Sequence, residues 1–377
     1  MSNPGFDRGQ SVSLRYSLIL SVGPMRIRPS SSTMRKSLKR AALHTLRKLG
    51  GSSVLAGSRW RSERLAILCY HGISLDDEHE WDPNFFMDPK RFEGRLQLLR
   101  DGGYNVLPLA EALHRLYART LPPKSVAITI DDGGYDFYRQ AFPLLREYGM
   151  PATVYLTTFY CFCSRPIFPI FLHYLLWKAR NTFQGSNLLG LNCPVDLHRK
   201  AGRQKIIDAI VADASERKML LAARHDLGGK LAAELGLDFQ QILSSRILQL
   251  MKPDEVSDLS KQGLDIQLHT HRHRTPRDRD LFVREIADNR KIIWEITGVD
   301  PVHFCYPSGV YDQIFLPWLA QERVVSATTC ESDLAAPSSH SLLLPRIVDT
   351  CNLSEMEFQG AIDGVTAAVR SGILRRS

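Results

Sequence analysis

Five short, mostly apolar runs that fit β-strands recur along the chain, and helical patterns lie between them. The runs occupy 65–70 (LAILCY), 125–130 (SVAITI), 152–156 (ATVYL), 264–268 (LDIQL) and 302–306 (VHFCY). The helical patterns occupy 89–102, 135–148 and 279–297. Continuous apolar strands that alternate with helices are typical of a parallel sheet or barrel with both faces covered. The pattern therefore predicts an α/β fold.

The stretch from about 159 to 260 breaks this alternation. It opens on an aromatic segment and continues with helical patterns at 204–221 and 231–251, without an obvious strand. We interpret it as a helical insertion in a barrel domain that spans 61–377. Such an insertion could form a lid or a surface for a partner.

Composition and cysteine usage narrow the class of protein. The chain has 377 residues, of which 44% are hydrophobic and 23% charged, as in ordinary globular proteins. A chain of this length can bury a large core without cross-links. Its seven cysteines are scattered, odd in number and without a CxxC pair. This usage argues against a disulfide framework and favours a reducing compartment.

The net charge of +8 is concentrated at the amino terminus. Residues 1–64 contain 13 Lys and Arg against Asp7 and Glu63, so that segment carries +11 and the remainder −3. The body therefore gives no electrostatic indication that it binds nucleic acid. The apolar run at 16–25 is too short to span a bilayer, and Pro24 interrupts it.

The basic leader at 1–60 could instead lie on a membrane surface. From Met34 onward, apolar residues recur at helical spacing between cations, at Leu38, Ala41, Ala42, Leu46 and Leu49. The pattern fits either an amphipathic helix on phospholipid or a solvated tail, and Met34 could be the true start. We expect a protein that is cytoplasmic or peripheral to the inner membrane face, and an exported location stays open.

Ionisable or polar residues follow four of the five apolar runs directly. They are His71, the pair Asp131 and Asp132, His269, and the turn 307–309 (PSG). In α/β barrels the loops after all the strands converge on one face, which holds the active site. Four such segments in one chain predict a site at that face.

The segment 131–134 (DDGG) is the sharpest of these signals. Two adjacent carboxylates after a buried strand repel each other and are costly to desolvate, so a metal or another cation must offset them. The glycines allow the backbone to turn tightly beside a ligand. A helix N-cap would explain one aspartate but not two. We therefore favour a functional role over a structural one.

His269 and His273 lie four residues apart, a spacing that brings two imidazoles to one point on a helical turn. His271 would then point elsewhere. The alternative is a polar surface loop, because the segment around these residues is hydrophilic. Together with Asp132, the two histidines would form a three-ligand catalytic metal site with room for water.

These motifs resemble those of the polysaccharide deacetylases, the nodulation-protein-B homology fold of carbohydrate esterase family four. TIDDG at 129–133 is similar to the family's TFDDG, and HTHRH at 269–273 is similar to its H-[ST]-x-x-H. FCYPSGVYD at 304–312 and LPRI at 344–347 resemble one variant of the family. CYHGI at 69–73 resembles the opening of the branch that includes bacterial poly-N-acetylglucosamine deacetylases. The resemblance covers about 62–350 apart from the insertion, and it implies a distorted parallel (β/α) barrel.

The resemblance also implies a role for each matching residue. Asp132, His269 and His273 would bind a divalent metal, typically zinc. Asp131 would be the general base that deprotonates the attacking water, and His71 the general acid that protonates the departing amine.

Two further residues follow from the same resemblance. The backbone N–H near Ser308 would stabilise the oxyanion, and Arg346 would orient Asp131 and hold it ionised. The chain departs from the family in its third motif, where 304–307 reads FCYP without the arginine of many members. Ser308 also stands where a tyrosine is common, which puts the substrate preference in doubt.

The leading hypothesis is a metal-dependent hydrolase that removes N-acetyl or O-acetyl groups from an amino-sugar polysaccharide or a glycan precursor. One alternative is a non-catalytic protein on the same fold that binds polysaccharide or assembles exopolysaccharide. Another is an amidohydrolase that acts on a small molecule. Cys161, Cys163 and His303 are expected to be structural, and His340 is a distant alternative for the general acid. The sequence does not indicate an oligomeric state.

Overall fold

The computed structural model describes residues 55–163, 165–183, 185, 187–190 and 196–370. The leader helix expected from Met34 lies outside these residues. A parallel sheet of eight strands forms the centre of the fold, in the order β10-β1-β5-β6-β7-β8-β9, with β4 paired to the start of β5. The strands are β1 Ala66–Tyr70, β4 Asn105–Val106, β5 Ser125–Asp132, β6 Ala152–Leu156, β7 Asp265–Leu268, β8 His303–Cys305, β9 Ser326–Thr328 and β10 Ile347–Val348. A separate parallel pair joins β2 Gly72–Ile73 to β3 Phe86–Met87.

The two edges of the main sheet approach each other. Thr328, at the end of β9, forms a parallel bridge with Leu344, which lies just before β10. Because β10 pairs with β1, this bridge curls the sheet towards closure. The predicted distorted parallel (β/α) barrel is confirmed.

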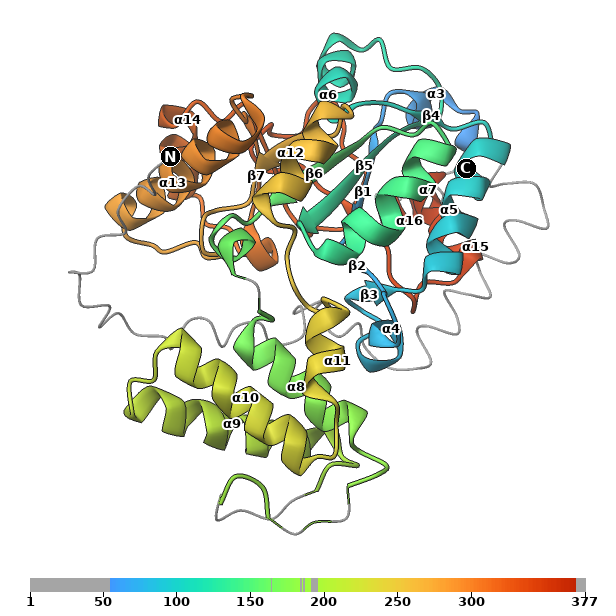
Figure 1. The fold of residues 1–377 in the computed structure, drawn as a ribbon. Coiled ribbons are helices and arrows are strands. Elements are labelled where there is room, and N and C mark those ends of the chain that lie inside the picture. Colours follow the sequence, from blue (N-terminus) through green and yellow to red (C-terminus); the bar gives the residue numbers. More distant parts are fainter. Residues whose placement is uncertain (1–54, 164, 184, 186, 191–195, 371–377) are drawn as a thin grey trace.

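Helices connect the parallel strands and cover the outside of the sheet (Figure 1). They are α5 Pro89–Asp101, α6 Leu109–Ala118, α7 Phe142–Glu147, α12 Pro253–Lys261, α13 Arg279–Thr297 and α14 Phe315–Gln321. The chain ends on α15 Glu355–Ile362 and α16 Val365–Arg370. Local signals set the limits of α13, since Asp278 accepts a hydrogen bond from the Leu281 N–H and Gly298 ends the helix with φ 74°.

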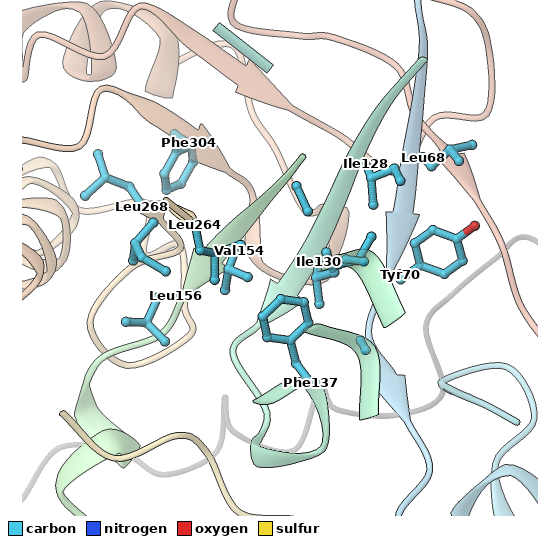
Figure 2. Close-up of a cluster of buried hydrophobic side chains, with 14 of the residues drawn as sticks. Leu68, Tyr70, Ile128, Ile130, Phe137, Val154, Leu156, Leu264, Leu268 and Phe304 are labelled. Atoms are coloured by element: carbon cyan, nitrogen blue, oxygen red, sulfur yellow. The ribbon is translucent and has the colours of Figure 1, made fainter. Parts of the chain in front are cut away.

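The core explains why the strands are continuous apolar runs. Every residue of β1 and β6 is buried, because helices on one side and the barrel interior on the other exclude water. Figure 2 shows Ile128 of β5 beside Leu68 of β1, with Val154 of β6 and Phe304 of β8 in the same cluster.

One predicted helix is interrupted. The pattern at 135–148 contains a π-helical turn, Phe137–Ala141, before α7 begins at Phe142. Pro143 has no N–H to donate to the preceding turn, so the backbone widens there instead of continuing as an α-helix.

Between β6 and α12, the described residues form four α-helices, α8 Phe168–Lys178, α9 Lys200–Glu216, α10 Leu221–Glu234 and α11 Phe239–Ser244. They bury an apolar cluster of their own, separate from the barrel core. The predicted single helix at 231–251 is wrong, because Gly236 takes a left-handed φ of 70° and separates α10 from α11. The predicted helix at 204–221 ends early, at Glu216, before Lys218 with φ 49°. The domain limits of 61–377 and 159–260 stay predictions.

These four helices lie on the side of the sheet towards which the strands run (Figure 1). The Tyr174 hydroxyl of α8 donates a hydrogen bond to Asp77 at 2.7 Å, beside the short helix α4 Glu78–Trp81. The returning chain pairs with the backbone after β5, where the Met251 N–H donates to the Gly133 carbonyl at 3.0 Å. No helix in the described ranges is both long enough and apolar enough to cross a membrane.

Candidate active site

Most of the residues singled out in the sequence lie at the carboxyl ends of parallel strands. His71 follows β1, Asp131 and Asp132 end β5, and His269 follows β7. Arg346 lies immediately before β10, the other neighbour of β1. Parallel strands bring these ends to one edge of the barrel, which is where α/β barrels place their active sites.

Asp132, His269 and His273 present their ligand atoms to one point. Asp132 Oδ1 lies 3.2 Å from the Nε2 atoms of both histidines, and the three ligand atoms fall within 4.8 Å of one another. One carboxylate and two imidazoles suit a borderline divalent cation and leave a coordination position open. The donor set thus fits the metal that the sequence implied.

The backbone is strained where it delivers two of these ligands. Asp132 has φ 70° and His273 has φ 54°, a left-handed conformation that is uncommon outside glycine. Side chains of adjacent residues in a regular strand point to opposite faces. The left-handed turn at Asp132 ends that alternation, so Asp131 and Asp132 both approach His269.

Gly133 makes this turn possible. It has φ 83°, and a Cβ at this position would lie 2.3 Å from Leu156 Cδ1. The close approach of β6 and the positive φ together require glycine directly after Asp132.

Hydrogen bonds orient His269. Its Nδ1 lies 2.8 Å from the carbonyl oxygen of Cys305, so Nδ1 carries the proton and Nε2 is free to bind a cation. Its backbone N–H donates to Asn289 Oδ1 at 2.9 Å, and Asn289 Nδ2 donates to the Leu156 carbonyl. Asn289 was not among the predicted site residues, although an asparagine on the apolar face of the predicted 279–297 helix is an unusual feature of the sequence.

Asp131 and Arg346 form a fully buried ion pair. Arg346 Nη1 and Nη2 each lie 2.7 Å from a carboxylate oxygen of Asp131, and Arg346 Nε donates to the Thr329 carbonyl. Burial alone would raise the pKa of Asp131, but the charge and hydrogen bonds of Arg346 outweigh it and hold that pKa below its usual range. Asp131 is therefore ionised at neutral pH.

His71 lies next to this pair. Its Nε2 is 3.7 Å from Asp131 Oδ2, its ring packs against Phe85 at 4.8 Å, and its side chain is 11% exposed. Burial lowers the pKa of His71, although the charges of Asp131 and Asp132 oppose the shift. The imidazole is therefore neutral at pH 7 before substrate arrives.

Ser308 lies in the short turn Pro307–Gly309 after β8, is exposed and has φ 56°. Its role stays a prediction. Two other histidines have side-chain partners away from the candidate metal group: His271 contacts Thr158 Oγ1 at 2.9 Å, and His303 contacts Ser326 Oγ at 2.8 Å. His340 is exposed and accepts a hydrogen bond from the Leu342 N–H.

Asp136, which the sequence pattern did not single out, joins the segment after β1 to the segment after β5. Its Oδ2 accepts a hydrogen bond from the Ile73 N–H at 2.5 Å, two residues after His71. Burial, together with the nearby charge of Glu78, raises the pKa of Asp136 to about 7. Only the folded chain brings 73 and 136 together, so no local pattern could have identified this contact.

The comparisons with known proteins all point to the same protein family. The model of the family described as polysaccharide deacetylase matches residues 118–161 and 227–323. The chain is 38% identical over 94 residues to YxkH of Bacillus subtilis, covering 25% of this chain and 32% of that protein. It is 32% identical over 104 residues to the Escherichia coli poly-β-1,6-N-acetyl-D-glucosamine N-deacetylase, covering 26% of this chain and 15% of that protein. The chain thus spans a third or less of these curated relatives.

Solved structures share the fold. The Streptococcus pyogenes deacetylase PplD, in complex with acetate, aligns with a TM-score of 0.53 and 19% identity over 79% of this chain and 98% of that one. IcaB from Ammonifex degensii aligns with a TM-score of 0.50 and 16% identity over 80% of this chain and 97% of that one. At these identities the likeness establishes the barrel alone. The family model and the curated relatives agree that this chain is similar to polysaccharide deacetylases, with the model matching residues 118–161 and 227–323.

Proposed function

We propose that this protein is a metal-dependent hydrolase that removes N-acetyl groups from amino-sugar units of a polysaccharide or glycan precursor. The observation that carries the proposal is the position of Asp132 Oδ1, 3.2 Å from the Nε2 atoms of His269 and His273, next to the buried carboxylate of Asp131. The names of the Escherichia coli and Staphylococcus aureus relatives support an N-acetylated amino-sugar polymer. Removal of O-acetyl groups would use the same chemistry.

Asp132, His269 and His273 would hold the divalent metal, and zinc is the ion that this nitrogen and oxygen donor set suits best. When bound, such an ion lowers the pKa of water and polarises a carbonyl group. The Nδ1 contact of His269 with Cys305 keeps the imidazole in the tautomer that binds a metal.

Asp131 would accept the proton of the attacking water. Arg346 keeps this carboxylate ionised and fixes both oxygens, so it acts as a positioning residue. The same pair makes Asp131 a weak base, because its pKa lies below the usual range. A proton on Asp131 is therefore readily passed to a better acceptor.

His71 is the nearest such acceptor. Its neutral ring lies 3.7 Å from Asp131, slightly beyond hydrogen-bond distance. A general acid must carry a proton before it can donate one. We infer that the neutral His71 takes up a proton during the reaction and then donates it to the departing amine. The backbone N–H of Ser308 would donate to the oxyanion, as the family resemblance implies.

Metal content and acetate release, measured together, test the proposal. The native chain should bind about one zinc ion and release acetate from N-acetylglucosamine oligomers. Asp131→Asn should keep the zinc and lose about 10²- to 10⁴-fold in rate, because it removes the base and leaves the ligands. Asp132→Ala should lose both.

Asp101→Asn is the matched control, because Asp101 is exposed on α5, where its side chain pairs with the neighbouring Arg100 far from the proposed ligands. It should keep zinc and activity. A native chain that binds zinc without releasing acetate from any acetylated sugar would point to the non-catalytic polysaccharide-binding alternative. A native chain without zinc would end the proposal.

We further propose that the basic leader places the protein at the inner membrane face. The charge of +11 over residues 1–64 supports attraction to anionic phospholipid. Flotation with phosphatidylserine vesicles should recover the native chain, but not a variant with Arg35, Lys36, Lys39 and Arg40 changed to glutamate. Equal recovery of the two would contradict membrane contact through the leader.

A further inference from the structure

The loop that carries His273 has an irregular and strained backbone. Residues 270–274, between β7 and α13, form neither helix nor strand. Thr270 has φ 62° and His273 has φ 54°, both in the left-handed region that residues other than glycine rarely adopt. Such a conformation persists only where the surroundings hold it. The contacts of this loop therefore determine where the His273 imidazole lies.

Glu285, on α13, contacts the loop on both sides of His273. Its carboxylate accepts hydrogen bonds from the Arg272 N–H at 2.8 Å, from Arg272 Nη1 at 3.2 Å and from Arg274 Nε at 2.6 Å. Its backbone carbonyl accepts a further hydrogen bond from the His271 N–H at 3.1 Å. Both sequence neighbours of His273 are thus tied to one residue of the helix.

The Glu285 side chain is buried, whereas its partners reach the surface. It is 1% exposed, and the side chains of Arg272 and Arg274 are 34% and 36% exposed. A carboxylate withdrawn from water is costly unless several donors satisfy it, and charged donors form the strongest such bonds. The two guanidinium groups and the backbone N–H supply these donors. The loop and the helix therefore hold each other in one arrangement.

The same helix also holds the other histidine of the proposed metal group. Asn289 lies four residues after Glu285 on the buried face of α13, and its Oδ1 accepts a hydrogen bond from the His269 N–H at 2.9 Å. Two buried polar side chains of one helix face thus fix the backbone at or beside His269 and His273. This face determines the separation of the two imidazoles, whose Nε2 atoms both lie 3.2 Å from Asp132 Oδ1.

We propose that Glu285 is a positioning residue for the metal site, which holds His273 in place for a divalent cation before the cation binds. Glu285 acts through Arg272 and Arg274 and lies outside the group of three proposed ligands. Removal of such an outer partner typically weakens metal affinity by about 10- to 100-fold. The inference rests on the proposed function, because it takes the same three residues as the metal ligands.

Zinc titration of the full chain, in competition with a chromogenic chelator, tests this role without an activity assay. Glu285→Gln should weaken zinc binding by about 10- to 100-fold. Glu285→Ala should weaken it further, because glutamine keeps one acceptor for the Arg272 N–H. With Co²⁺ in place of zinc, the visible absorption bands of both variants should shift or lose intensity, since these bands report the coordination geometry of the ion.

Glu295→Gln is the matched control, because Glu295 is an exposed carboxylate on the same helix, where it pairs with Lys291. It should bind zinc and cobalt as the native chain does. Thermal unfolding without metal separates positioning from a general loss of structure. A Glu285→Gln variant that unfolds at a lower temperature but binds zinc with native affinity while folded would overturn the proposal.

Arg274→Met is a second variant for the case that changes at Glu285 prevent folding. It removes the contact on one side of His273 at a partly exposed position, and zinc affinity should fall at least several-fold. Native zinc affinity in a folded Arg274→Met variant would also contradict the positioning role.

Acetate release distinguishes this inference from the proposed function. At saturating zinc, Glu285→Gln should regain most of the native kcat, because Asp131 and His71 are unchanged. Weakened zinc binding in Glu285→Gln, with no acetate release by the native chain, would leave the positioning role standing and the hydrolase proposal wrong. Native zinc affinity in Glu285→Gln, with full acetate release, would mean the reverse. A native chain that binds no zinc would overturn both.

Discussion

Arg346 meets both carboxylate oxygens of Asp131 at 2.7 Å, although 215 positions separate the two residues in the sequence. Both side chains are almost entirely withdrawn from bulk water, since the arginine is 0% and the aspartate 3% exposed. Each charge is therefore compensated almost wholly by the other. This dependence makes the pair costly to break from one side only.

Arg346→Met should lower the free energy of unfolding by about 3–5 kcal/mol at neutral pH, because it leaves Asp131 buried without a partner. The folded pKa of Asp131 is depressed, so its contribution to stability is present above the unfolded pKa of about 4 and is lost as pH falls below it. The difference between native and variant in urea denaturation should therefore shrink in acid.

The double variant Asp131→Asn/Arg346→Met tests the cause. It removes both charges and should recover most of the lost stability, as measured by the same denaturation curves. A double variant as unstable as Arg346→Met would mean that the loss arises from packing around the arginine stem and not from an unpaired carboxylate.

His71→Gln should reduce kcat for acetate release by about 10²- to 10⁴-fold, because the departing amine would lose its proton donor. Bound zinc should not change, since His71 is not among the proposed ligands. Its control is His340→Gln, at the exposed position whose imidazole bonds only to the neighbouring Leu342 N–H among the contacts in the described part of the chain. A comparable loss of kcat in His340→Gln would argue against His71 as the specific proton donor.

Asp136→Asn should stabilise the protein above pH 7 and have little effect near pH 4. The pKa of Asp136 is raised from 3.8 to about 7, so its favourable contribution is fully present below the unfolded pKa and is lost as pH rises through 7. The neutral amide avoids this loss and can still accept the Ile73 N–H. The gain at pH 8 should reach at most about 4 kcal/mol.

Urea denaturation of the Asp136→Asn variant and the native chain at pH 5 and pH 8 measures this gain. A gain that is the same at both values would show that ionisation of Asp136 is not its source.

Gly133→Ala should destabilise the fold by about 1–3 kcal/mol and weaken zinc binding, because alanine disfavours φ 83° and its Cβ would collide with Leu156. Isothermal titration with zinc and thermal denaturation measure the two effects. Gly94→Ala, on the exposed face of α5 with no atom within 4 Å of the new Cβ, should instead stabilise by roughly 0.5–1 kcal/mol. Unchanged zinc affinity in Gly133→Ala would show that the turn is not needed to place Asp132.

The strands were the most predictable part of the fold. The runs at 65–70, 125–130 and 152–156 correspond to β1, β5 and β6 within one or two residues. A parallel strand buried on both faces must be apolar at nearly every position, so its signal is local and strong. The two-residue strands β4 and β10 were not predicted, because so short a strand forms through pairing with its neighbours and leaves no pattern in its own sequence.

The helical segment between β6 and β7 was less predictable. The pattern at 231–251 is apolar at helical spacing throughout, yet the chain bends at Gly236 so that α11 can pack its own apolar face on the same cluster. Local helix propensity is too weak to distinguish one long helix from two short ones. Tertiary packing makes that choice here.

The apolar runs alone indicated that His71, the two aspartates and His269 would meet, because each lies at the end of a parallel strand and such strands end at one edge. Their catalytic roles stay predictions. Only the tertiary structure decided what surrounds them. Arg346 on Asp131, Asn289 behind His269 and Asp136 on Ile73 are contacts between segments far apart in the chain. These contacts form because burial withdraws charged and polar groups from water. Each such group must then pair with a partner that the fold brings within reach.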